Sequence, residues 1–401
     1  MKINIKRLLL VMSDSLNFVE EEFLGITTGH TQRVTYLCMK IGHKMKLTED
    51  ELMDFLACAI LHDNAIPHYI EEEYLRPIDT ITVDWVGKHC VVGEYNVSGF
   101  PFVTDITGII RYHHERANGT GPLHRREEDT PFLAQVLHIC DAADRFCFSD
   151  KRKIRTYDQL IHFLKNGKGI LYGAECVNVF CEHITQKEYD VYMGETIRDS
   201  LKDELPQVER EYTYQQVKPI AELFAKIIDY KSEYTGIHSV QLAAKAQIMA
   251  EYYNMPQDEK DQFYIAALLH DLGKFAIAND ILEKNGKLSY DEYEIMKNHA
   301  YYTYSNLSSI HGFDKITEWA SNHHEKLNGS GYPFGKTADQ LDRNSRLLAC
   351  LDIYQALTEE RSYKKGMKHE ESIYILYEMV ARGELDGALT AHIDRVFGNY
   401  A

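Results

Sequence analysis

The chain carries one ordered set of histidines and aspartates twice. Two similar phrases mark the repeat most clearly, "RYHHERANGTGP" at residues 111–122 and "SNHHEKLNGSGYP" at residues 321–333. The other landmarks keep the same order in both halves, at offsets of 208 to 211 residues: His30, His62, Asp63, His89, His113, His114 and Asp141, then His238, His270, Asp271, His299, His323, His324 and Asp352. Seven matched residues with so little drift indicate a duplicated domain.

The stretches between these landmarks are typical of helices. In "HSVQLAAKAQIMAEYY" (238–253) and "DEKDQFYIAALLHDLGKFAI" (258–277), apolar residues recur every three or four positions, which predicts an apolar stripe along each helix. Capping boxes predict that helices begin at Thr48 with Glu51 and at Ser289 with Glu292. Alternating strand patterns are almost absent. We therefore predict an all-α chain of two tandem helical bundles.

The expected domain boundaries follow from the repeat and from composition. The first bundle is expected over residues 1–197 and the second over residues 216–401. Between them, residues 198–215 are acidic and contain a proline, so this segment is expected to be a linker or a connecting helix. The length of 401 residues agrees with two domains of ordinary size.

Composition argues against several classes of protein. A formal net charge of -17 argues against a broad duplex nucleic-acid footprint, because such binding draws mainly on cation–phosphate attraction. No apolar run approaches the roughly 18 residues of a membrane span, so we expect no membrane association and a cytoplasmic location. The eight cysteines are scattered without a CxxC pair, which favours reduced core thiols over a disulfide or zinc framework.

The second half concentrates side chains that can bind metal ions. His270 and Asp271 follow four apolar residues, and a buried aspartate is costly unless it is paired or coordinated. Taken alone, this pair fits a hydrogen-bonded core pair as well as a metal site. The whole set of five histidines and two aspartates suits a two-metal centre with a bridging carboxylate, in which the ions lie about 3.5–4 Å apart.

The motifs of the second half resemble those of a known family. The order H…HDxGK…H…HHExxNGxGYP…D is complete, with "HDLGK" at 270–274, "HHEKLNGSGYP" at 323–333 and "DIYQALTEERSYKKGM" at 352–367. This pattern resembles the HD-GYP family of HD-domain metal-dependent phosphohydrolases, over roughly residues 215–400. The resemblance implies tandem HD domains, a centre of iron or manganese ions, and hydrolysis of cyclic di-GMP, or in some members cyclic GMP-AMP. The product would be a linear dinucleotide, formed by a metal-bridged hydroxide.

The resemblance also implies a role for each matched residue. One ion would be held by His238, His270, Asp271 and Asp352, and Asp271 would bridge to a second ion completed by His299, His323 and His324. Lys274 would act with Asp271 in catalysis and neutralise a phosphate oxygen. Tyr332 would line the substrate pocket, and Arg361 and Lys364 would hold the substrate's phosphates.

The motifs specify the number and identity of the metal ions less directly than the ligands. Histidine and carboxylate ligands also suit zinc or nickel. Family members with a third ion have a carboxylate at the place where Tyr234 stands here, so the resemblance implies two ions.

The first half keeps every expected metal ligand but lacks several substrate contacts. Ile66 stands in place of Lys274, the tyrosine of the glycine-rich turn is missing, and Asp150 replaces Arg361, while Lys153 is kept opposite Lys364. Fewer cations should weaken the binding of a doubly anionic substrate. Three interpretations stay open: a metal-binding, catalytically weak partner domain, a phosphohydrolase for another nucleotide, or a ligand-sensing module.

Two alternatives to a cyclic-dinucleotide phosphodiesterase also stay open for the whole chain. One is a phosphohydrolase of another nucleotide or phosphorylated metabolite. The other is a non-catalytic signalling module that binds a cyclic dinucleotide or a GGDEF-type synthase partner. The sequence is compatible with a homodimer, and it does not distinguish guanine from adenine in the substrate.

Overall fold

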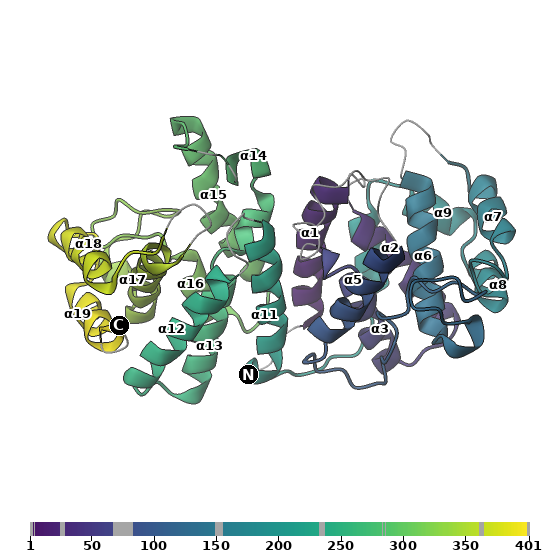
Figure 1. The fold of residues 1–401 in the computed structure, drawn as a ribbon, viewed down its shortest axis with the longest axis horizontal. Helices are drawn as coiled ribbons and strands as arrows, with labels where there is room; N and C mark the ends of the chain where they lie inside the picture. Colours follow the sequence, from purple (N-terminus) through teal and green to yellow (C-terminus); the bar gives the residue numbers. More distant parts are fainter. Residues whose placement is uncertain are drawn as a thin grey trace. The chain divides into compact units, whose positions relative to one another are not determined.

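The computed structural model describes residues 3, 5–24, 29–66, 83–148, 155–231, 237–282, 284, 286–360 and 365–398. Helices are the regular secondary structure of this part of the chain (Figure 1), and its residues form isolated β-bridges but no strands. The all-α prediction is therefore confirmed. The chain divides into two compact units, Lys6–Arg210 and Glu211–Ala401 together with Met1–Ile5, called the first and second unit below.

The first unit holds the helices of the amino-terminal half. They are α1 (Ile5–Leu24), α2 (His30–Lys44), α3 (Glu49–Leu61), α5 (Val83–Asn96), α6 (Phe132–Phe148), α7 (Tyr157–Asn166), α8 (Ala174–His183), α9 (Gln186–Tyr192) and α10 (Ile197–Asp203). Helix α2 packs against α3, α6 and α8. The segment 198–215, expected to be a linker or helix, contains all of α10 except Ile197. Residues 204–213 are non-helical, and the next helix begins at Tyr214.

The second unit repeats this plan. Its helices are α11 (Tyr214–Lys231), α12 (His238–Tyr252), α13 (Gln257–Leu269), η3 (Leu272–Ala276, a 3-10 helix), α14 (Asn279–Leu282), α15 (Tyr290–Leu307), α16 (Asp314–Ser321), α17 (Arg343–Thr358), α18 (His369–Ala381) and α19 (Gly387–Phe397). Helix α13 packs against α11, α12 and α16, so it lies at the centre of the bundle.

Burial along α12 and α13 shows why the bundle forms. In α12 the buried residues recur at three and four residue spacing from Ser239 to Ala250, which confirms the predicted stripe. In α13, Phe263 and every residue of 265–269 are buried, so the carboxyl-terminal half of this helix is enclosed on all sides rather than along one stripe. The sequence predicted a single apolar stripe along α13, but a wider surface of this helix is buried. A helix with neighbours on three sides needs apolar residues all round.

Both predicted capping boxes are present. The hydroxyl of Thr48 accepts a hydrogen bond from the amide of Glu51, whose carboxylate accepts one from the amide of Thr48. Ser289 and Glu292 make the same pair of contacts at the start of α15. These contacts fix where α3 and α15 begin, and hence the register of the histidines that these helices position.

None of the helices in the described residues is both long and apolar enough to cross a bilayer. The eight cysteines are free thiols, and all but Cys181 are buried. Most of them therefore serve as small core residues, in agreement with the sequence prediction. Cys90 differs from the others, because it lies among histidines.

Candidate metal centres

The His270–Asp271 pair lies where the buried helix α13 ends. His270 caps the helix and Asp271 precedes η3. The amide of Gly273 donates to the hydroxyl of Thr303 at 2.9 Å, and this hydroxyl donates to the carbonyl of His270, also at 2.9 Å. A Cβ atom on Gly273 would lie 1.9 Å from the carbonyl oxygen of His299. In the second unit, any side chain at position 273 would therefore push η3 away from α15, the helix that carries His299.

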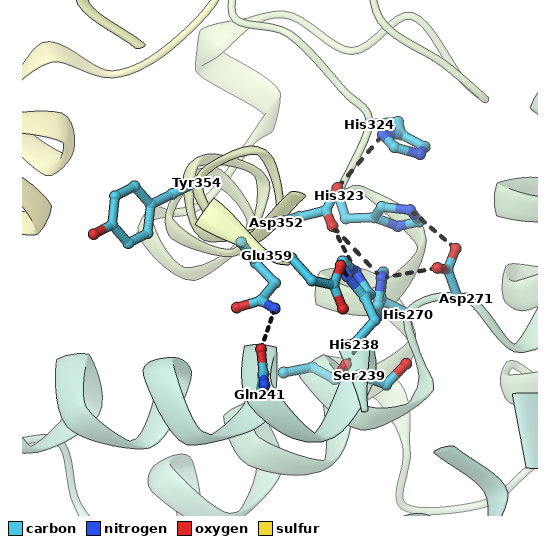
Figure 2. Close-up of polar contacts among 12 residues, drawn as sticks. His238, Ser239, Gln241, His270, Asp271, His323, His324, Asp352, Tyr354 and Glu359 are labelled. Carbon is cyan, nitrogen blue, oxygen red and sulfur yellow. Dashed lines mark hydrogen bonds and ion pairs between the residues drawn. The ribbon is translucent and has the colours of Figure 1, made fainter. Parts of the chain in front are cut away.

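Five histidines surround two carboxylates in the second unit. Figure 2 shows four of them, His238, His270, His323 and His324, around Asp271 and Asp352. The Nε2 atoms of three of them face Asp271: His270 at 3.1 Å, His299 at 3.4 Å and His323 at 3.9 Å. Three rings face Asp352: His238 at 3.4 Å, His270 at 3.7 Å, and His324 at 3.9 Å through its Nδ1 atom. His270 thus stands between the two carboxylates. The structure brings together all seven residues that the sequence pattern selected.

The far side of several rings is already occupied by a hydrogen-bond acceptor. The Nδ1 atoms of His270, His299 and His323 donate to backbone carbonyls three residues earlier, at 2.8, 2.7 and 2.6 Å. The Nδ1 atom of His238 lies 2.9 Å from a carboxylate oxygen of Glu359. These contacts leave the Nε2 atoms aimed at the carboxylates, which is the arrangement of metal-ligating histidines held by outer partners.

The charge state of these groups also fits metal ions. Burial raises the pKa of the Asp271 carboxyl, but the neighbouring His270 and Lys274 hold this pKa well below its ordinary value. Burial, together with the ring of His299, lowers the pKa of His324 to about 3. Burial likewise lowers the pKa of His323. At neutral pH, Asp271 is therefore a carboxylate and His323 and His324 are neutral imidazoles, the forms that coordinate divalent ions.

Burial lowers the pKa of His238, but hydrogen bonds to Asp352 and Glu359 outweigh burial and raise it to about 10. Against burial, Asp271 likewise raises the pKa of His270, so these two rings release a proton when a cation binds.

The structure places two of the four expected substrate residues. The Nζ atom of Lys274 lies 2.6 Å from Asp271, so its charge stands at the edge of the cluster. The ring of Tyr332 lies 4.7 Å from the ring of His324, centroid to centroid, and 6.2 Å from that of His299. Arg361 and Lys364 lie outside the described residues, as do Tyr234, Asp150 and Lys153.

The first unit builds a similar cluster from its own seven residues. The Oδ1 atom of Asp63 lies 3.3 Å from Nε2 of His89 and 3.5 Å from that of His113, and Oδ2 lies 3.4 Å from Nε2 of His62. Asp141 faces His30 at 3.4 Å and His114 at 3.8 Å. The Nδ1 atoms of His62 and His113 donate to backbone carbonyls, as in the second unit.

Several buried atoms of the first cluster have no hydrogen-bond partner among the described residues. They are both carboxylate oxygens of Asp63 and the Nε2 atoms of His62, His113 and His114. Leaving such polar atoms unsatisfied costs about 1–3 kcal/mol each. A bound cation would satisfy them together, so the first unit also fits metal ions.

Four residues close to the clusters were missed by the sequence analysis. Asp144 accepts a hydrogen bond from His30, at 2.7 Å, and Glu359 takes this role for His238. Arg145 approaches both carboxylates of the first cluster, with Nε 2.8 Å from Asp141 and Nη2 3.6 Å from Asp63. Cys90 is the fourth. The signal for Arg145 was its position one helical turn after Asp141, on the same face of α6.

Comparisons with known proteins agree with this architecture. Family models described as HD domain match residues 27–146 and residues 222–389. The 3'3'-cGAMP-specific phosphodiesterase 1 of Vibrio cholerae is 28% identical over 89% of this chain and 84% of the relative. The 3'3'-cGAMP-specific phosphodiesterase 3 of the same organism is 28% identical over 93% and 90% of the two chains.

A solved structure shows the same fold. The crystal structure of a cyclic GMP-AMP-specific phosphodiesterase of V. cholerae matches with a TM-score of 0.64 over 98% of this chain and 97% of that one, at 21% sequence identity. A helical bundle with a buried His-Asp pair among further histidines defines the HD class of domain. The chain contains two HD domains and is homologous to the HD-GYP phosphodiesterases of cyclic dinucleotides, which confirms the resemblance drawn from its motifs.

Proposed function

We propose that the second unit is a metal-dependent phosphodiesterase that hydrolyses a cyclic dinucleotide to the linear dinucleotide. The observation that carries this proposal is the convergence of five imidazoles and two carboxylates at the end of α13. Two relatives that match nearly the whole chain are named as phosphodiesterases specific for 3'3'-cGAMP. This naming favours 3'3'-cGAMP over cyclic di-GMP as the substrate.

The ligands divide into two sets that share one carboxylate. His238, His270, Asp271 and Asp352 would hold one ion, and Asp271 would bridge to a second held by His299, His323 and His324. Bound divalent ions supply a Lewis acid that lowers the pKa of water and neutralises phosphate charge. We favour iron or manganese, and the same ligands would accept zinc or nickel.

The remaining residues would position the substrate. Lys274, beside Asp271, is placed to pair with a non-bridging phosphate oxygen. Tyr332 would pack on the substrate over the ring of His324. Arg361 and Lys364 follow Asp352 in the family motif, and we propose that they bind the phosphates of the substrate. Binding through these contacts would hold one phosphodiester against the metal ligands.

The cellular setting follows from the proposed substrate. We infer that the chain acts in the cytoplasm and receives its substrate from a cyclic-dinucleotide synthase, with a GGDEF-type enzyme as the partner that the family resemblance suggests. A homodimer is compatible with this role. Light scattering on the purified chain measures its oligomeric state directly.

The test is a substrate panel on the full chain. Protein purified without oxygen and loaded with iron or manganese would be incubated with 3'3'-cGAMP, cyclic di-GMP and cyclic di-AMP, and linear products separated by anion exchange. We expect linear product from 3'3'-cGAMP, and none from Asp271→Asn protein. Absence of linear product from every cyclic dinucleotide by fully metallated protein overturns the proposal. Binding of a cyclic dinucleotide without hydrolysis would favour the alternative that the chain is a non-catalytic signalling module.

A further inference from the structure

A cysteine lies inside the histidine cluster of the first unit. Cys90 is fully buried on α5, and its Sγ atom lies 3.6 Å from Nε2 of His89. The thiol and the coordinating atoms of His89, His113 and His114 all lie within 4.8 Å of one another. The thiol also donates to the carbonyl of Val86 at 3.1 Å. Cys90 is therefore placed to act as a fourth ligand.

The distance between His89 and Cys90 fits a tetrahedral ion. Zinc binds imidazole nitrogen at about 2.05 Å and thiolate sulfur at about 2.3 Å, so a tetrahedral site needs N···S separations of about 3.6 Å. The separation between His89 and Cys90 is 3.6 Å. Buried Nε2 atoms of His113 and His114 lack hydrogen-bond partners among the described residues. The four donors therefore lie close enough together to share one ion.

The second unit has no equivalent ligand at this position. The offset that relates His89 to His299 places Ala300 opposite Cys90. An alanine leaves that side of the cluster without a donor, as a catalytic site requires for water and substrate. In the first unit, the thiol fills this side.

The first cluster is also more enclosed than the second. The side chain of His114 is 11% exposed, against 29% for His324, and that of Asp141 is 2% exposed, against 10% for Asp352. Arg145 lies against Asp63 and Asp141 from α6, where the second unit has Ala356. Both the arginine and the thiol therefore add a polar group against the first cluster at positions where the second unit has alanine.

We propose that His89, Cys90, His113 and His114 form a closed, thiolate-ligated zinc site that stabilises the first unit and takes no part in hydrolysis. Thiolate is a soft ligand that suits zinc, and closed four-coordinate sites are structural. The site lies in the first unit, so it does not depend on the substrate of the second.

Cobalt(II) reports thiolate ligation directly. Metal-free full-length protein would be titrated with cobalt without oxygen, and the near-ultraviolet charge-transfer absorption of a cobalt–thiolate bond followed. We expect this band to appear in the parent protein and to bleach when zinc is added. It should be lost in Cys90→Ala, which copies the residue of the second unit, and kept in Cys58→Ala, a buried cysteine of α3.

The zinc protein itself gives a measurement without any variant. X-ray absorption at the zinc edge should show a sulfur neighbour at about 2.3 Å. Two outcomes overturn the proposal: zinc with only nitrogen and oxygen neighbours, or a cobalt–thiolate band that survives in Cys90→Ala. If Cys90→Ala does not fold, the absorption spectrum of the parent zinc protein still decides between these ligand sets.

Discussion

The Oε2 atom of Glu359 lies 2.9 Å from the Nδ1 atom of His238 (Figure 2), and the carboxylate is almost fully buried. The first unit orients its equivalent ring with Asp144, 2.7 Å from His30. Asp144 stands three residues after the aspartate of its cluster, and Glu359 stands seven residues after its own, one helical turn further along. Asp144 lies inside α6, whereas Glu359 stands just after the end of α17, so the two carboxylates reach equivalent rings from different backbone positions.

Glu359→Gln is expected to weaken metal binding by the second unit about 10-fold or more, because an amide no longer holds His238 with a negative charge. The measurement is the dependence of the hydrolysis rate on manganese concentration, in which excess metal should restore most of the rate. Asp144→Asn is the matched control in the first unit and should leave this dependence unchanged. A Glu359→Gln protein with the parent's metal dependence would contradict the assignment.

Gly273→Ala is expected to reduce hydrolysis by about 100-fold or more. The new Cβ atom would lie 1.9 Å from the carbonyl oxygen of His299, so η3 must move away from α15 and carry Asp271 with it. A displacement of about 1 Å at a catalytic group can cost this much rate. The first unit has Ala65 at this position, so the close approach is specific to the second unit.

The control for this change is Gly387→Ala, at the start of α19. Its added Cβ atom would meet only a side-chain methyl of Val380, at 3.1 Å. We expect near-normal turnover from the control, and helical circular dichroism from both variants. Normal turnover in Gly273→Ala would mean that the spacing between η3 and α15 does not set the site.

The two clusters are expected to differ in their effect on activity. His270→Ala with Asp271→Ala should abolish hydrolysis, because it removes two proposed ligands of the second unit, one of which, Asp271, is the proposed bridging carboxylate. His62→Ala with Asp63→Ala should leave most of the activity while lowering the metal content of the protein. Elemental analysis and the substrate panel measure the two effects separately. The opposite ranking would move catalysis to the first unit.

Comparison of the two halves of the sequence predicted the metal clusters because metal ligation restricts each position to a few residue types. The same comparison could not find Glu359 and Asp144, because they stand at different offsets from their aspartates. Nor could it find Cys90 or Arg145, which have no counterpart of the same type in the second half. Spacing within one helix could have found Arg145, four residues after Asp141, but the place of Cys90 among the histidines depends on which helix faces touch, which sequence spacing does not specify.

Residues around the motifs were also harder to predict than the motifs. The helix that carries the His-Asp pair was expected to have one apolar stripe, yet residues 265–269 are all buried. In the sequence, a short apolar run looks the same whether neighbouring helices cover one face of the helix or all of its faces. The central position of α13 follows only from the packing of its neighbours.

Asp342 caps α17, the helix that carries Asp352. Its carboxylate accepts hydrogen bonds from the amide of Ser345, at 2.8 Å, and from the indole of Trp319, at 2.9 Å. Burial raises the pKa of Asp342, but the hydrogen bonds from Ser345 and Trp319, together with the charge of Lys315, outweigh burial and lower the pKa below its ordinary value. A group with a lowered folded-state pKa stabilises the protein above the unfolded-state pKa, about 3.9, and loses this contribution as pH falls through the folded value.

Asp342→Asn should therefore destabilise the second unit by about 1 kcal/mol at neutral pH, because asparagine can still cap the helix but lacks the charge. The difference from the parent should shrink as pH falls below about 3.9 and vanish below the lowered pKa of Asp342. Urea unfolding measures this difference in the free energy of unfolding, with Trp319 fluorescence as the signal. Both proteins would carry Trp85→Phe, which removes the other tryptophan. A difference that stays constant through this acid range would show that the carboxylate charge adds nothing to the cap.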